Sequence, residues 1–227
     1  MPTEQTESVA LHSGEYVERY NRKPLDRVRA LASRIDLAED DELADFACGN
    51  GMLLQVVGDR IGTYHGVDFS NDFIASARDW ARSKGLNNCQ FYCDDIIKFC
   101  ADHPAQFDVA TTLDFSEHID DALAVSIYSA IRSSLRPGGK LYLHTPNLDF
   151  FMERAKDMGV LRQFPEHIAV RNGNAIKDIL IHSGFDASKI EVDTIAHYNI
   201  LKVLHPFSRL PLVGKYFEAR LWIKASV

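Results

Sequence analysis

The chain has no excess of positive charge, no long apolar run and few cysteines. Its 25 Lys and Arg residues are outnumbered by 32 Asp and Glu residues, giving a formal net charge of −7. Binding to a nucleic-acid backbone needs a basic surface, so we expect no nucleic-acid partner. No apolar run approaches the length of a membrane span, and the polar start MPTEQTES lacks the core of a signal peptide. The sequence therefore predicts a cytoplasmic protein.

The four cysteines give no metal-binding pattern. They are Cys48, Cys89, Cys93 and Cys100. None forms a C-x-x-C pair, and no second cluster completes a zinc site, so we predict no metal centre. Cys48 lies in a Gly-rich turn, where we interpret it as a small residue beside a ligand rather than as a reactive thiol.

The order of apolar patterns predicts the fold class. Strand-like and helical runs alternate from Leu43 to Ala225 in a chain of 227 residues. This alternation favours an α/β fold, a three-layer, doubly wound, seven-stranded and mostly parallel sheet whose last strand is antiparallel. We predict N-terminal helices over residues 1–40, a main domain over 41–227, and a lid-like insertion near 147–171.

The stretch from Leu43 to Ser70 reads as strand, glycine turn, helix, strand and acid. Glycines let the backbone approach a ligand closely, and an acid that ends the second strand can accept hydrogen bonds from a ribose diol. A dinucleotide-binding turn needs G-x-G-x-x-G, but the third glycine position holds Leu54. A triphosphate-binding loop is also absent. Asp45 lies four residues before Gly49, and we expect it to brace the turn through its amides.

This arrangement resembles motif I of the class I S-adenosylmethionine-dependent methyltransferases. The resemblance places Asp68 at the ribose and Asp94 at the adenine, although Asp94 could instead cap the helix that follows. We expect the cofactor S-adenosylmethionine, and its product S-adenosylhomocysteine, to contact residues after the first four strands. The expected contacts are Asp45, Ala47, Cys48, Gly49, Asn50, Gly51, Asp68, Phe69, Asp94, Asp95, Ile96, Leu113, Asp114, Phe115 and His118.

Three later segments extend the resemblance. The L-R-P-G-G run from Leu135 to Gly139 is a marker that precedes the fifth strand in this family. Glu117-His118-Ile119 matches the acid-His-aliphatic sequence that follows the fourth strand in many small-molecule methyltransferases. Glu166-His167-Ile168 resembles a segment of the ubiquinone-pathway O-methyltransferases. The resemblance implies a small-molecule acceptor, since the nucleic-acid motif [DNS]-P-P-[YFW] is missing.

Hydroxyl methylation usually requires a base or a metal. The oxygen atoms of Glu117, Asp114 and Glu166 could hold a divalent ion, but no sequence spacing demands one. We predict His118, His167 and His144 as candidate bases, with a neighbouring carboxylate raising the proton affinity of the first two. His118 could alternatively cap the next helix. Tyr16, Tyr20, Asn147, His167 and Arg171 are the predicted acceptor contacts. We predict O-methylation as the reaction, with N-methylation as the second candidate and a cofactor-binding protein without turnover as the alternative class of function. The protein could also form a homo-oligomer.

Overall fold

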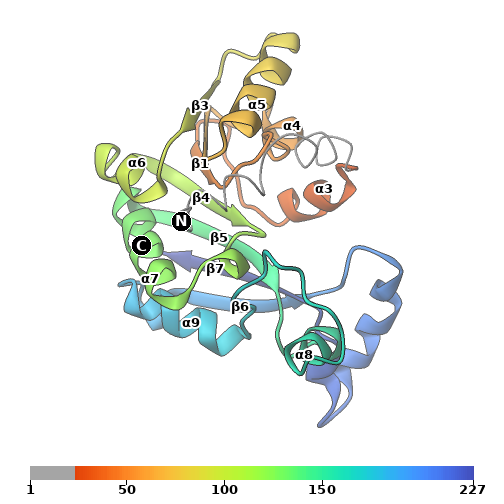
Figure 1. The fold of residues 1–227 in the computed structure, drawn as a ribbon. Coiled ribbons are helices and arrows are strands. Elements are labelled where there is room, and N and C mark those ends of the chain that lie inside the picture. Colours follow the sequence, from red (N-terminus) through yellow and green to blue (C-terminus); the bar gives the residue numbers. More distant parts are fainter. Residues whose placement is uncertain (1–23) are drawn as a thin grey trace, which may run out of the picture.

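The computed structural model describes residues 24–227, so the predicted contacts Tyr16 and Tyr20 lie outside the described residues. Seven strands form one sheet in the order β3-β2-β1-β4-β5-β7-β6 (Figure 1). The strands are β1 Glu42–Phe46, β2 Thr63–Asp68, β3 Cys89–Cys93, β4 Phe107–Leu113, β5 Leu135–Pro146, β6 Ile190–Ile195 and β7 Arg220–Ser226. β7 pairs antiparallel with β5 and β6, and the four pairings among β1 to β5 are parallel. The predicted α/β sheet with an antiparallel last strand is confirmed.

Helices cover both faces of the sheet. The α-helices are α3 Asp26–Ala32, α4 Leu54–Val57, α5 Asn71–Ser83, α6 Ile96–Asp102, α7 Asp121–Ser134, α8 Phe151–Asp157 and α9 Gly173–His182. The short 3-10 segments are η1 Ser116–His118, η2 Ala187–Lys189, η3 Ile200–Arg209 and η4 Gly214–Phe217. No helix among residues 24–227 is long and apolar enough to cross a membrane.

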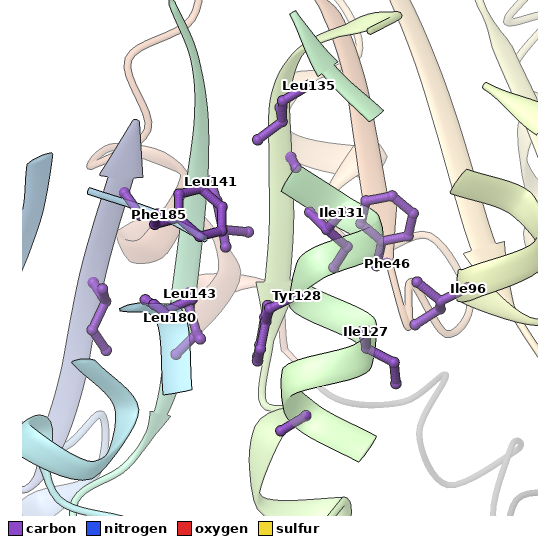
Figure 2. Close-up of a cluster of buried hydrophobic side chains, with 14 of the residues drawn as sticks. Phe46, Ile96, Ile127, Tyr128, Ile131, Leu135, Leu141, Leu143, Leu180 and Phe185 are labelled. Carbon is purple, nitrogen blue, oxygen red and sulfur yellow. The ribbon is translucent and has the colours of Figure 1, made fainter. Parts of the chain in front are cut away.

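Alternating strand residues supply two cores. On β5, Leu141 and Leu143 pack with α6, α7 and α9, whereas Tyr142 between them packs with α3, α4 and α5. Figure 2 shows the first core, in which Tyr128 and Ile131 of α7 face the strands. Because successive side chains of a strand point to opposite faces, a strand covered on both sides is mainly apolar, although β1 also carries the buried Asp45.

Helix ends follow the expected chemistry in several places. Ser70 caps α5 by accepting from the Phe73 amide, and Gly85 beyond the helix has a positive φ of 66°. Asn172 caps α9 in the same manner. The apolar residues spaced from Leu53 to Ile61 predict a longer helix after the glycine turn. That extent is wrong, because α4 ends at Val57 and Gly58 follows as its C-cap.

Candidate active site

The loops that follow β1 and β4 meet at the carboxyl edge of the sheet, because the two strands are parallel neighbours. Each loop begins with a non-glycine residue in the left-handed region, Ala47 with φ of 56° and Asp114 with φ of 55°. Such conformations cost about 1–3 kcal/mol each and concentrate at functional sites. Gly49 and Gly51 in the first loop also have positive φ. This edge is therefore the candidate active site.

Asp45 lies beneath this edge, almost completely buried. Its Oδ2 accepts a hydrogen bond of 2.6 Å from the Tyr64 hydroxyl, and its Oδ1 accepts one of 2.6 Å from the Thr111 hydroxyl. The prediction that Asp45 braces the turn through amides is thus corrected, because hydroxyls of β2 and β4 hold the carboxylate. Burial raises the pKa of Asp45 to about 6, despite those two hydrogen bonds.

Asp68 ends β2 and ties the glycine turn to the next helix. Its Oδ2 accepts from the Gly49 amide at 3.0 Å, and its Oδ1 accepts from the Ser70 amide at 2.8 Å. A carboxylate offers about four acceptor positions, so each oxygen keeps capacity for a ligand hydroxyl. Burial raises the pKa of Asp68, while the two amides act in the opposite direction.

The backbone around the turn is closely packed. A Cβ on Gly66 would lie 2.6 Å from Phe91 Cδ1 and 3.0 Å from Cys48 Sγ. A Cβ on Gly51 would lie 3.1 Å from Phe91 Cε1. Burial raises the pKa of the Cys48 thiol well above its usual range, which supports its interpretation as a packing residue. Phe69, next to Asp68, is 45% exposed. A diol acceptor beside an exposed aromatic ring fits a nucleoside such as that of S-adenosylmethionine.

The third strand ends in two acids with different roles. Asp95 is the N-cap of α6 and accepts from the Lys98 amide at 3.0 Å. The capping role considered for Asp94 therefore belongs to its neighbour. Asp94 pairs with the Lys98 ammonium at 2.7 Å, and that hydrogen bond lowers the pKa of Asp94. Ile96 is buried as the first residue of α6.

Asp114 has side-chain partners on three elements. Arg27 of α3 and Arg220 of β7 both form ion pairs with it, the latter at 3.3 Å. The His144 Nδ1 on β5 lies 2.8 Å from the Asp114 carboxylate. Leu113 and Phe115 on either side pack against the two cores. The expected contact position of Asp114 thus contains a charge cluster, and neither arginine was predicted from the sequence.

His144 is poorly suited to act as a base. Its side chain is fully buried, and its ring packs on Tyr198 at 5.7 Å. Burial, together with Arg220 and Arg27, lowers the pKa of His144 well below the ordinary value. The buried Tyr198 hydroxyl has no hydrogen-bond partner in the described part of the chain. The prediction of His144 as a base is corrected to a neutral, packed imidazole.

His118 and His167 do come together, as predicted. Their ring centroids are 5.2 Å apart at 87°, in an edge-to-face contact. His118 Nδ1 lies 2.7 Å from the Glu166 carbonyl oxygen. A carbonyl only accepts, so Nδ1 carries the hydrogen and Nε2 carries the lone pair. The expectation that His118 caps the next helix is wrong, because Asp120 caps α7.

The protonation of these histidines differs from the prediction. Burial lowers the pKa of His118, and burial together with His118 lowers the pKa of His167 to about 4. A neighbouring carboxylate was expected to raise both values, but desolvation of the imidazolium outweighs that attraction. Glu117 is itself buried, accepts from the Thr145 hydroxyl at 3.1 Å, and has its pKa raised by burial. Both imidazoles are therefore neutral near pH 7.

Arg171 has a structural role in place of the predicted acceptor contact. Its guanidinium donates to the Ser116 carbonyl at 2.6 Å and to the Ile119 carbonyl at 2.7 Å. It also pairs with Asp121 at 2.7 Å. These contacts hold both ends of η1, which carries Glu117 and His118, in place. Arg171 is thus a positioning residue, with its donors directed at protein acceptors.

The side chain of Asn147 also forms its hydrogen bonds with the backbone. Its side-chain amide donates to the Glu218 carbonyl at 2.8 Å, and its Oδ1 accepts from the Asp149 amide at 3.1 Å. It also forms an isolated parallel bridge with Arg171. The side chain is only 2% exposed, so the prediction of an acceptor contact is corrected.

One cluster in the described part of the chain has the composition of a cation site. Ligand atoms of Glu117, His118 and His167 all lie within 4.8 Å of one another. Glu117 was expected as a possible oxygen ligand, whereas neither histidine was predicted as a metal ligand. Neutral imidazole and carboxylate are ordinary ligands of divalent metals.

Comparisons with known proteins agree with this geometry. A family model described as a methyltransferase domain matches residues 15–190. The ubiquinone biosynthesis O-methyltransferase of Idiomarina loihiensis is 30% identical over 134 residues, which are 59% of this chain and 54% of the relative. That of Klebsiella pneumoniae is 27% identical over the same shares of the two chains. The chain thus spans about half the length of the curated relatives it matches.

Solved structures share the fold at low identity. The methyltransferase in complex with the Haloferax volcanii Trm112 activator has a TM-score of 0.71 at 16% identity, covering 97% of each chain. A SAM-dependent methyltransferase from Archaeoglobus fulgidus has a TM-score of 0.68 at 18% identity, covering 92% of this chain and 97% of that one. With the family model matching most of the sequence, we conclude that the chain belongs to the S-adenosylmethionine-dependent methyltransferases.

Proposed function

We propose that this protein methylates a hydroxyl group of a small molecule, with S-adenosylmethionine as the methyl donor. The observation that carries the proposal is the state of His118. Its Nδ1–H is held by the Glu166 carbonyl, its ring is neutral, and it follows the fourth strand at the carboxyl edge. A neutral imidazole that carries its hydrogen on Nδ1 has its lone pair on Nε2, and this is the form that accepts a proton from a hydroxyl. The names of the relatives support the same reaction class.

The cofactor side is assigned to the loops after β1, β2 and β3. When bound, S-adenosylmethionine supplies an electrophilic methyl group on its sulfonium. Asp68 accepts hydrogen bonds from the hydroxyls of its ribose, and the turn from Cys48 to Gly51 brings its backbone close to the cofactor. Asp94 and the start of α6 receive its adenine, and Asp45 contributes negative charge beneath the turn. We expect these residues to orient the donor for in-line transfer.

The acceptor side is assigned to the segments after β4 and β5. His118 takes the hydroxyl proton at Nε2, while His167 stacks edge-to-face on its ring and limits its rotation. The Phe164 ring extends this group of rings, since its centroid lies 5.3 Å from that of His167. Arg171 keeps η1 in place from below. The lid role of residues 147–171 and the covering role of residues 1–40 remain part of the proposal.

An acceptor screen tests this function. The protein is incubated with methyl-labelled donor and a panel of phenols, aliphatic alcohols and amines, and products are identified by mass spectrometry. O-methylated products that disappear with His118→Ala support the proposal. Methylated amines that survive this substitution would instead favour N-methylation, because an unprotonated amine needs no base. Cofactor binding without any S-adenosylhomocysteine formation would identify a non-catalytic binding protein.

A further inference from the structure

Exposed apolar side chains are concentrated at one end of the molecule. Of the seventeen large hydrophobic residues exposed in the described part of the chain, twelve lie within residues 151–168 and 200–213. The second group consists of Ile200, Val203, Phe207, Leu210, Leu212 and Val213. Monomeric soluble proteins rarely expose such concentrations without a binding role.

The two groups lie side by side. Phe151 of α8 packs on Phe217 of η4 with ring centroids 6.2 Å apart, and Phe217 packs on Phe207 of η3 at 5.5 Å. The Arg154 guanidinium lies over the Tyr216 ring at 5.5 Å. Figure 1 shows α8 close to the blue segment between β6 and β7. One segment follows the end of β5 and the other precedes β7, so both leave the sheet at the same edge.

The charge of residues 195–217 is opposite to that of the whole protein. This segment contains Lys202, Arg209 and Lys215 and no Asp or Glu, in a chain of net charge −7. All three cationic side chains are exposed, interspersed with the exposed apolar residues. Residues 151–168 contain three acidic and three basic residues, so the positive excess lies on residues 195–217. This basic and apolar segment is complementary to anionic lipid headgroups above an acyl layer.

The loop after η3 presents its apolar tip in a fixed shape. Leu212 is 96% exposed and has a positive φ of 67°, which is strained for a side chain of this size. The Gly214 amide closes the loop onto the Leu210 carbonyl at 2.9 Å. A Cβ on Gly214 would lie 2.1 Å from the Ser208 carbonyl oxygen, so only glycine fits at this position of the loop. A leucine held outward in this way is suited to insertion.

We propose that residues 200–215, together with the neighbouring apolar residues of 151–168, dock the protein onto an anionic phospholipid bilayer. Protein interfaces are depleted in Lys, whereas this surface carries the exposed Lys202 and Lys215 beside protruding aliphatic side chains. Residues 200–215 lie beyond residues 15–190, which the methyltransferase family model matches, whereas residues 151–168 lie within that range. The docking proposal does not depend on which acceptor is methylated.

Vesicle co-sedimentation tests the proposal with the full chain. Vesicles of equal parts phosphatidylcholine and phosphatidylglycerol should bind the protein at low salt, and vesicles of pure phosphatidylcholine should bind it much less. Each of Lys202→Ala, Arg209→Ala and Lys215→Ala should weaken binding about fivefold. The apolar pair Val203→Ser with Leu212→Ser should weaken it about tenfold or more. Raising the salt from about 0.1 to 1 M should remove the charge-dependent part.

Matched controls separate docking from general surface effects. Leu123→Ser on α7 and Arg82→Ala on α5 change an exposed apolar and an exposed cationic residue away from the patch, and they should leave vesicle binding unchanged. Circular dichroism melting confirms that all variants fold. Absence of binding to the anionic vesicles, or equal binding by the patch and control variants, would overturn the proposal. So would concentration-dependent dimerisation that Leu212→Ser abolishes, because the surface would then serve a second copy of the chain.

Discussion

His118 Nδ1 lies 2.7 Å from the Glu166 carbonyl oxygen, although the two residues are 48 positions apart in the chain. This contact connects the segment after β4 to the segment before α9. It fixes the tautomer of His118, and it brings the second E-H-I sequence to the first. The acceptor side of the proposed reaction is built on this pair.

Removal of the proposed base should reduce turnover without affecting the donor. We expect His118→Ala to lower kcat by about 10²–10⁴-fold, because general-base catalysis contributes on that scale. The affinity for S-adenosylmethionine, measured by calorimetry, should change less than about twofold. His182→Ala is a matched control, since His182 Nδ1 also lies 2.7 Å from a backbone carbonyl, that of Asp178, on the exposed side of α9. If His118→Ala and His182→Ala turn over alike, another group performs the deprotonation.

The pH profile should report the lowered pKa of the same residue. A histidine with a lowered pKa stays neutral to more acidic pH than usual. The acid limb of log kcat/KM against pH should therefore fall below about 6.5, the ordinary histidine value, and the rate should be level from there to neutral pH. An acid limb at or above pH 7 would mean that the imidazolium is stabilised, contrary to the buried environment described above.

Asp45 should lower the stability of the protein at neutral pH. Its pKa in the folded state is about 6, above the ordinary aspartate value of 3.8. A raised carboxyl pKa favours the protonated form on folding, so its contribution to stability is present at low pH and is lost as pH rises from 3.8 to 6. The difference corresponds to about 3 kcal/mol at neutral pH. We expect Asp45→Asn to stabilise the protein at pH 7.5 by about 1–3 kcal/mol while weakening cofactor binding.

Urea unfolding at pH 4 and pH 7.5 measures this effect. The stability gained by Asp45→Asn should be large at the higher pH and nearly absent at the lower one. Asp79→Asn on the exposed face of α5 is the control, because its ion pair with Arg82 is solvent-exposed and should matter little. A destabilised Asp45→Asn variant at pH 7.5 would show that the hydrogen bonds from Tyr64 and Thr111 outweigh the cost of burial.

Arg171 should be sensitive even to replacement by lysine. A lysine keeps the charge but cannot donate from one planar fork to the Ser116 and Ile119 carbonyls together. Because those buried acceptors would lose their partners, Arg171→Lys should cost about 2–4 kcal/mol of stability. At a temperature where the variant is folded, kcat should fall and the KM for the donor should stay the same. Arg82→Lys provides the exposed comparison, and equal effects of both substitutions would rule out the positioning role.

Much of the fold was predictable because its signals are local. The apolar runs of β1 and β2, the glycine turn between them and the cap at Ser70 each lie within a few residues, and the structure contains all of them. The length of α4 was overpredicted because apolar spacing was followed past Gly58, where glycine disfavours continuation of a helix. The antiparallel β7 was inferred from the order of elements and from the family resemblance.

The chemistry of the site was less predictable. Arg27 and Arg220 are ordinary basic residues in the sequence, 193 positions apart, and only the fold places both on Asp114. The proton affinity of the histidines was predicted with the wrong sign, because neighbouring acids are visible in a sequence whereas burial is not. The structural role of Arg171 was also not predictable, because its partners are backbone carbonyls and no sequence pattern identifies such partners.

The most direct test of the account is calorimetric titration of S-adenosylmethionine into the wild-type protein and Asp68→Ala. The account predicts that the wild type binds and that NAD does not. The substitution should cost about 2–4 kcal/mol of binding, the scale of hydrogen bonds to a charged acceptor. Asp68 also accepts hydrogen bonds from the Gly49 and Ser70 amides. A thermal melting curve must therefore confirm that the variant is folded at the titration temperature. Unchanged affinity in a folded Asp68→Ala variant, or no binding by the wild type, would contradict the assignment of this edge as the cofactor site.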